Sequence, residues 1–205
     1  MNINGILKKL SARTLTHRPS LLTAVLLLLL ILACEGEPQF STKYRCSFVY
    51  YASDHTTSAL TLSLTNPGHY VIVEPKFVAG VTHLKLTPNQ GQWEENQTDI
   101  AMRTVIENER LTYDNMGANR RLIIGCSKFN GPKCYDGQCP YCLENTTSPN
   151  NPLTWTENGE MLDCKKCHIV YNPNAEGQPV NGNEHTPRLI EYRVEYNGQR
   201  LYCYN

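Results

Sequence analysis

The sequence lacks the motifs of the common catalytic sites. It contains no Gly-x-Ser-x-Gly, no His-Glu-x-x-His and no glycine-rich phosphate loop, so serine hydrolases, zinc proteases and P-loop enzymes have no local signature in it. Asp54 stands beside His55, but adjacency in sequence is no sign of a triad with a distant serine. We therefore expect no enzymatic activity and assign no catalytic residue and no cofactor.

The chain also lacks an excess of basic residues. It holds 19 Lys and Arg against 19 Asp and Glu, and residues 1–36 contain four of the basic residues and one of the acidic ones. The remaining chain therefore has 15 basic and 18 acidic residues, a formal charge of −3. Nucleic acids and anionic membranes attract basic surfaces, so we expect no nucleic-acid partner.

No apolar run is long enough for an ordinary membrane span. The longest run, Leu21–Ala33, has 13 uncharged residues, whereas a spanning helix needs about 20. It follows a basic stretch without acidic residues and leads into small residues, which is typical of a secretion signal. We predict that residues 1–36 are a cleaved signal peptide, and that residues 37–205 form a secreted, extracellular protein without membrane insertion.

Two alternatives for the N-terminus stay open. Ile31-Leu32-Ala33-Cys34 resembles a bacterial lipoprotein box, in which Cys34 would be acylated and would anchor the protein to lipid. The leucine at the middle position is bulkier than this box usually has. In the other alternative the leader is retained as a signal anchor.

Cysteines are abundant in the rest of the chain. Eight follow the predicted leader: Cys46, Cys126, Cys134, Cys139, Cys142, Cys164, Cys167 and Cys203. An even number of cysteines in an exported chain is typical of a disulfide framework. Because eight cysteines allow about a hundred pairings, all eight are disulfide candidates and none is assigned a partner.

Four of these cysteines also have the spacing of a metal site. Cys139 and Cys142 form one Cys-x-x-Cys motif, and Cys164 and Cys167 form a second one after 21 intervening residues. Four thiolates at such spacing can surround a zinc ion. With His168, the second pair also reads as the Cys-x-x-Cys-His attachment motif of c-type haem. Because an oxidising compartment favours disulfides, we rank zinc and haem below cross-links and predict no metal.

Two tripeptides are acceptor sequences for N-linked glycans. They begin at Asn96 and Asn145. If the host is a eukaryote, export through the secretory pathway predicts glycosylation at both.

Alternating apolar residues predict a mainly β fold. Residues 60–64 (LTLSL) alternate leucines with hydroxyl residues, and Asn66-Pro67-Gly68 then predicts a turn into a second strand at 70–73. Further strands are expected at 77–79, 81–86 and 121–129. Residues 99–110 are ambiguous, and a helix is possible there.

The last residues carry the clearest hairpin pattern. Residues 190–196 alternate apolar and charged side chains, Asn197-Gly198 follows, and residues 199–204 form a second strand-like run. Asn-Gly favours the type I′ turn of hairpins. We predict a closing β-hairpin over 188–205.

Residues 130–187 differ in composition from their surroundings. They are rich in Pro, Gly, Asn and Cys and have little apolar periodicity, so they bury too little apolar surface to order themselves without cross-links. We therefore predict a single antiparallel β-sandwich or barrel-like domain over 37–205, with a disulfide-rich, loop-dominated insertion at about 130–187.

One segment resembles a known family. Gln92-Trp93-Glu94, followed by 111–117 (LTYDNMG) and Arg121, is similar to the opening segment of ependymin-related proteins. That resemblance implies a secreted, cysteine-bridged β protein around an apolar pocket. The family's cysteine before the tryptophan and its long second half are absent here.

These features predict an extracellular binding protein without catalytic activity. Its partner would be an extracellular protein, a glycan or a small apolar ligand. The 12 tyrosines against 4 phenylalanines favour recognition, because tyrosine suits half-wet contact surfaces. The alternatives are an ependymin-like or lipocalin-like carrier of a small apolar ligand, and an exported zinc or haem protein.

Overall fold

The computed structural model describes residues 40–205, except for residues 110 and 149. The predicted signal peptide and Cys34 lie outside the described residues. The fold is mainly β, with 38% strand and 12% helix, which confirms that part of the prediction. Among the described residues, no helix combines the length and apolar character needed to span a membrane.

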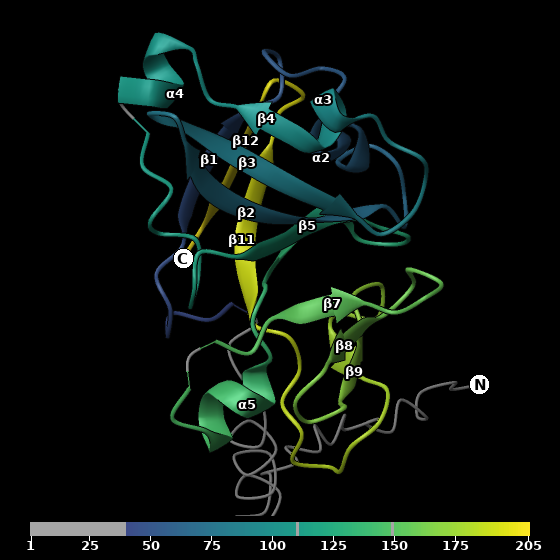
Figure 1. Cartoon of the computed structure of the whole chain (residues 1–205). Helices are drawn as coiled ribbons and strands as arrows, with labels where there is room; N and C mark the ends of the chain where they lie inside the picture. The colour runs from purple at the N-terminus through teal and green to yellow at the C-terminus, as the bar shows by residue number, and fades with distance from the viewer. Residues whose placement is uncertain (1–39, 110, 149) are drawn as a thin grey trace, which may run out of the picture. The chain divides into compact units, whose positions relative to one another are not determined.

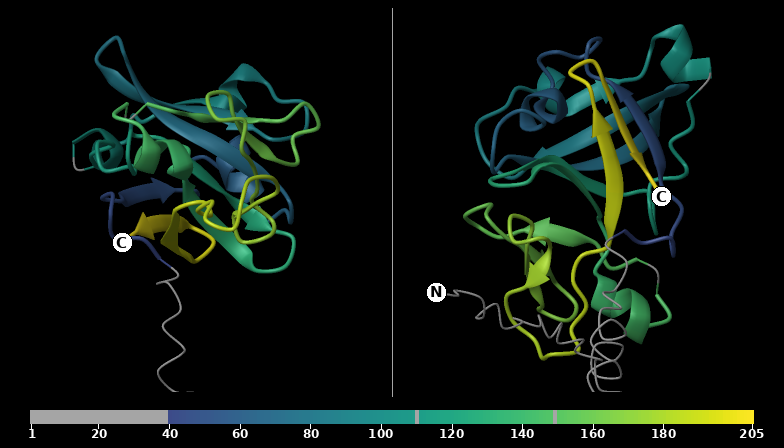
Figure 2. Two further views of the ribbon diagram at one scale, coloured as in Figure 1. Left: turned by 90° about the horizontal axis from the view of Figure 1, so that it is seen from below. Right: turned by 180° about the vertical axis from the view of Figure 1, so that it is seen from behind.

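An antiparallel sheet of eight strands curls into a half-barrel (Figure 1). In spatial order its strands are β1 (Ser47–Tyr51), β12 (Arg200–Tyr204), β11 (Glu191–Tyr196), β6 (Gly131–Asp136), β5 (Leu122–Ser127), β2 (Tyr70–Val78), β3 (Val81–Pro88) and β4 (Asp99–Ala101). The C-terminal hairpin thus joins the first strand to the rest of the sheet, which the view from behind shows (Figure 2).

A second, smaller sheet lies between β6 and β11 in the sequence. It consists of β10 (Gln178–Pro179), β9 (Val170–Asn172), β8 (Leu162–Cys164) and β7 (Leu153–Trp155), in that spatial order. Helix α5 (Pro140–Asn145) precedes it. We call residues 137–190 the cysteine module. The first residues of the predicted insertion belong instead to the large sheet, because 131–136 form β6.

The central strands β2 and β5 are buried on both faces. Val71 and Val73 of β2 belong to the core on one face of the sheet. Tyr70 and Ile72 belong to a second core on the other face, together with residues of the cysteine module. Burial on both faces explains why these strands read as continuous apolar runs rather than as alternating ones.

Two polar contacts also attach the module to the large sheet. Nε1 of Trp155 donates a hydrogen bond of 2.8 Å to the carbonyl of Thr87. The guanidinium of Arg121 donates one of 2.9 Å to the carbonyl of Leu153. The module is therefore fixed to the sheet by both apolar and polar contacts.

The predicted strand at residues 60–64 is wrong. These residues form α2 (Ala59–Ser63), with Leu64 as its C-cap. Ser58 caps the helix, because its hydroxyl accepts a hydrogen bond of 3.1 Å from the backbone N–H of Thr61. Leu60 and Leu64 are both buried, since residues four apart share a helix face. The spacing of the leucines is compatible with a strand or a helix, and the N-cap Ser58 favours the helix.

The other predicted strands agree better with the structure. Residues 70–73 and 77–78 lie in β2 and residues 81–86 lie in β3, and the two strands pair across a turn at Ala79 and Gly80 with φ of 48° and 88°. The C-terminal hairpin is confirmed as β11 and β12, with Gly198 at φ 86°. The ambiguous stretch 99–110 divides into β4 and α4 (Val105–Glu109). Helix α3 (Glu95–Thr98) precedes β4.

Gly125, in the middle of β5, leaves no room for a side chain. A Cβ there would lie 2.6 Å from Cα of Tyr70 and closer still to the carbonyl oxygen of His69. We expect Gly125→Ala to lower the free energy of unfolding by about 3 kcal/mol, because the backbone of β2 cannot yield easily. Chemical denaturation measures this change.

Gly131→Ala is the matched control. A Cβ at Gly131 meets no atom within 4 Å, although its φ is 68°. Backbone strain alone should cost about 1 kcal/mol. Equal costs for the two variants would show that close packing at Gly125 is not what matters.

Candidate metal centre

The four cysteines of the two Cys-x-x-Cys motifs meet in the cysteine module. The Sγ atoms of Cys139, Cys142, Cys164 and Cys167 all lie within 4.8 Å of one another. Sγ of Cys139 is 3.6 Å from Sγ of Cys167, and Sγ of Cys142 is 3.7 Å from Sγ of Cys164. A disulfide bond is only about 2.05 Å long. A tetrahedron with metal–sulfur bonds of about 2.3 Å has edges of about 3.8 Å.

The first pair is presented by the start of α5. Cys139 is the N-cap, Pro140 follows at the first helical position, and Cys142 lies in the first turn. Proline fits this position because its fixed φ suits the helix and its missing N–H would be unpaired there anyway. The backbone N–H of Cys142 donates a hydrogen bond to the sulfur of Cys139. The two sulfurs are thereby held on one side of the helix start.

The second pair is presented by a tight turn after β8. The backbone N–H of His168 donates a hydrogen bond of 2.8 Å to the carbonyl of Cys164, and that of Cys164 donates one of 3.1 Å to Ile169. His168 adopts φ 59°, which lets the chain reverse. The backbone N–H groups of Lys166 and Cys167 donate to the sulfur of Cys164. Such donors stabilise negative charge on sulfur.

Three of the four cysteines are buried, and Cys167 is partly exposed. Burial raises the pKa of Cys139 above its usual range and that of Cys142 to about 12. Burial also acts to raise the pKa of Cys164, but the N–H groups of Cys167 and Lys166 and neighbouring thiols outweigh it and lower the pKa. The thiol of Cys164 thus ionises more readily than the thiols of Cys139 and Cys142, which would lose their protons only to a cation.

Apolar side chains surround the four sulfurs. Leu153, Leu162 and Tyr171 belong to the same core as Cys139, Cys142 and Cys164. The hydroxyl of Tyr171 lies 3.6 Å from Sγ of Cys139. Packing therefore fixes the positions of the sulfurs and excludes water from most of the site.

The haem alternative does not fit this arrangement. Haem attachment would require the sulfurs of Cys164 and Cys167 to face a porphyrin, with His168 as an iron ligand. Cys164 instead faces Cys142 inside a packed core. His168 is exposed and does not belong to the group of four.

The predicted disulfides are not shown. In the part of the chain that the structure describes, the eight candidates, namely Cys46, Cys126, Cys134, Cys139, Cys142, Cys164, Cys167 and Cys203, are all free cysteines. Outside the group of four, Cys46, Cys134 and Cys203 lie in the core of the half-barrel. Cys126 lies near the end of β5, where Sγ is 3.6 Å from the carbonyl of Ser127.

Both predicted glycan acceptors are exposed. Asn96 lies in α3, and Asn145 is the last residue of α5. Their exposure is a condition for glycosylation, which stays a prediction.

His55 has a different partner from the serine that a hydrolase would require. Its Nε2 lies 2.6 Å from the carboxylate of buried Glu107. The other oxygen of that carboxylate accepts hydrogen bonds from the backbone and the hydroxyl of Thr104. The hydroxyl of Ser58 already bonds Tyr50 and the start of α2. The pair therefore anchors α4 to the half-barrel.

Comparison with known proteins gives no relative: no model of a protein family, no curated protein and no solved structure matches this chain. The similarity of residues 92–121 to ependymin-related proteins therefore stays a local resemblance.

We predict that Cys→Ser substitution at any of the four positions removes the bound metal. Purified protein should contain one metal ion per chain, and the variant close to none, because three thiolates and a hydroxyl bind weakly in a buried site. Elemental analysis measures the content. Cys126→Ser is the control: this buried thiol lies outside the group, and its loss should leave the metal in place. Metal retained after Cys164→Ser would contradict the assignment.

Proposed function

We propose that this chain is a non-enzymatic metal–thiolate protein. Cys139, Cys142, Cys164 and Cys167 would bind a single ion, zinc in the first place, and that ion would hold the cysteine module together. The observation that carries the proposal is the position of the four sulfurs, which lie within 4.8 Å of one another. Two of their separations, 3.6 and 3.7 Å, are close to the edge of a zinc–sulfur tetrahedron.

The distances favour one ion over an iron–sulfur cluster. A two-iron cluster takes two thiolates on each iron, so thiolates on different irons are separated by the length of the cluster. Such a group would not fit within 4.8 Å. Zinc and a single iron ion both accept four thiolates at tetrahedral corners.

The ligand set favours a structural role over a catalytic one. Catalytic zinc keeps a coordination position open for water or substrate, whereas four protein ligands close the site. Three of the four cysteines are also buried. The ion would therefore stabilise the fold and would not activate a substrate.

The cysteine module needs such an ion for its own order. Its strands β7, β8 and β9 have three residues each and β10 has two, too few to hold a sheet together alone. Metal binding would supply the free energy that the small core of the module lacks.

Export remains part of the proposal, on the strength of residues 1–36. Thiols in an oxidising compartment tend to pair, and a metal ion would keep these four from doing so. The extracellular binding function, with a protein, glycan or small ligand as partner, also stays a proposal from the sequence.

Hydrogen exchange with and without a strong chelator tests the structural role. We expect chelation to remove amide protection in residues 137–190 and to leave β2, β3 and β5 protected, because the large sheet has a core of its own. The Cys126→Ser variant should respond in the same way. Protein without metal, unaffected by chelator and lighter by four hydrogens than the reduced chain, would show two disulfides in place of the ion.

Metal affinity should fall as the pH falls. Burial raises the pKa of Cys139 above its usual range and that of Cys142 to about 12, so both thiols carry protons near neutrality and metal must displace them. Displacement of at least these two protons makes the affinity change by about a hundredfold per pH unit or more. A competition titration against a coloured chelator, from about pH 6 to about pH 8, measures this slope. A change below tenfold per unit would contradict it.

A further inference from the structure

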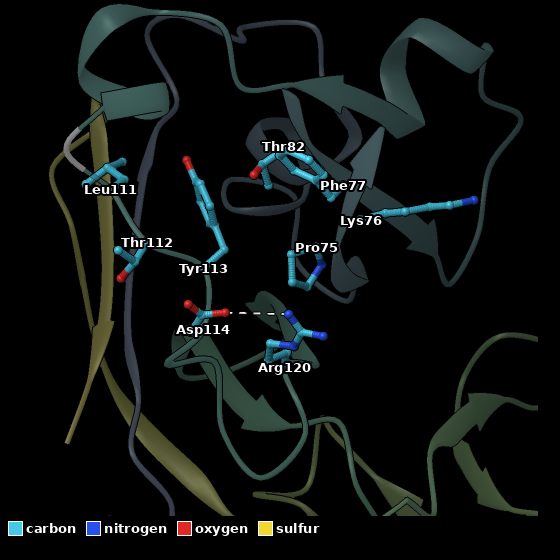
Figure 3. A pocket seen from close by; sticks show the side chains of 9 residues that line it. All are labelled: Pro75, Lys76, Phe77, Thr82, Leu111, Thr112, Tyr113, Asp114 and Arg120. Atoms are coloured by element: carbon cyan, nitrogen blue, oxygen red, sulfur yellow. Dashed lines mark hydrogen bonds and ion pairs between the residues drawn. The ribbon is translucent and has the colours of Figure 1, made fainter. Parts of the chain in front are cut away.

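A separate feature of the molecule is a hollow beside the β2–β3 hairpin. It has a volume of about 370 Å³ and lies between the hairpin and residues 111–114 (Figure 3). Cavities that bind small molecules measure about 300–1,000 Å³. The metal ligands do not line it, so it is independent of the proposed metal centre.

The walls of the hollow combine polar side chains with apolar ones, some of them aromatic. Pro75 and Phe77 line one side, and Leu111 and Tyr113 line the other (Figure 3). Phe77 is 74% exposed and lies in the second half of β2, where the strand leaves the core. Tyr113 is only 7% exposed, and its hydroxyl has no hydrogen-bond partner among the described residues. An exposed aromatic ring opposite a buried one forms a slot suited to a flat apolar group.

The lower end of the hollow carries charge. The guanidinium of Arg120 lies 3.5 Å from the carboxylate of Asp114, and both side chains are exposed (Figure 3). Exposed ion pairs contribute little free energy, so a ligand can replace this one at small cost. Arg120 also adopts φ 49°, a conformation that non-glycine residues rarely take without a reason in the surrounding structure. Lys76 lines the hollow as well, and its ammonium points outward (Figure 3).

We propose that this hollow binds a small organic anion with a flat apolar body. The body lies between Phe77 and Tyr113, and the anionic group takes the place of the Asp114 carboxylate on Arg120. Two cations, Lys76 and Arg120, and one carboxylate, that of Asp114, line the hollow, so its net charge favours an anion over a cation. This proposal gives the small-ligand function predicted from the sequence a site and adds a charge to its ligand.

Two fluorescent probes of similar shape test the proposal. Anilinonaphthalene sulfonate is a flat apolar anion, and N-phenyl-1-naphthylamine is its uncharged counterpart. We expect the sulfonate to bind at one site per chain. Phe77→Ser should lower the affinity for both probes roughly tenfold, because the apolar body of each probe loses its contact with the aromatic ring. Arg120→Gln should lower the affinity for the sulfonate probe alone, because the uncharged probe has no anionic group for Arg120 to bind. Asp114→Asn should raise the affinity for the sulfonate probe alone, because that change removes the competing carboxylate.

Phe129→Ser is the matched control. Phe129 is 83% exposed and lines a different hollow, at the β5–β6 turn, so its loss should leave both probes unaffected. Phe77, Asp114 and Arg120 are all exposed, and equal melting temperatures would confirm that the variants fold. The proposal is overturned if the sulfonate does not bind, if Phe77→Ser has no more effect than Phe129→Ser, or if Asp114→Asn and Arg120→Gln shift its affinity in the same direction.

Discussion

The convergence of four cysteine sulfurs in one small volume is the constraint on which the cysteine module depends. The turn after β8 and the start of α5 bring four thiols into one small volume, and backbone N–H groups turn towards two of the sulfurs. As neutral thiols they would pack as small apolar groups, but as thiolates they would push the two segments apart. Only a cation between them converts this repulsion into attraction. The proposed metal would take the place of the thiol protons and bind the two segments to each other.

Two hydrogen bonds link the module to the half-barrel, on the face of the large sheet that packs against the module. Tyr70 of β2 and Tyr135 of β6 both donate hydrogen bonds of 3.1 Å to the carbonyl of Pro173, in the loop after β9. Both rings are fully buried, and burial raises the pKa of each hydroxyl, so the two groups stay neutral donors. These two hydrogen bonds fix the loop after β9 to the large sheet. The sheet thus positions the module, and the proposed ion orders it internally.

The sequence predicted best what local chemistry decides. Asn197-Gly198 and the alternation around it predict the closing hairpin, because turn residues and side-chain period act over a few residues. The same reasoning failed at residues 60–64, where a period of two and a helix with Leu60 and Leu64 on one face produce the same apolar spacing. A single capping serine, Ser58, decided between them.

The candidate metal centre shows a different limit. The two Cys-x-x-Cys motifs name the correct four residues, but their spacing is compatible with disulfides, zinc or haem alike. The argument for disulfides was the oxidising compartment of an exported protein, and that argument applies to all eight cysteines equally. The structure separates them, because Cys46, Cys134 and Cys203 lie in the half-barrel core while the other four meet in the module. Only the path of the chain between the motifs supplies that distinction. The hollow beside Phe77 could not be predicted for the same reason, since its walls come from segments far apart in the sequence.

X-ray absorption at the metal edge of the purified protein tests the central claim most directly, because it identifies the metal and counts its neighbours. One ion surrounded by four sulfur atoms at about 2.3 Å, with no second metal nearby, is the result that the account predicts. A metal–metal distance would instead indicate a cluster. The absence of any stoichiometric metal, together with four oxidised sulfurs, would show that the cysteines cross-link the module and would contradict the account.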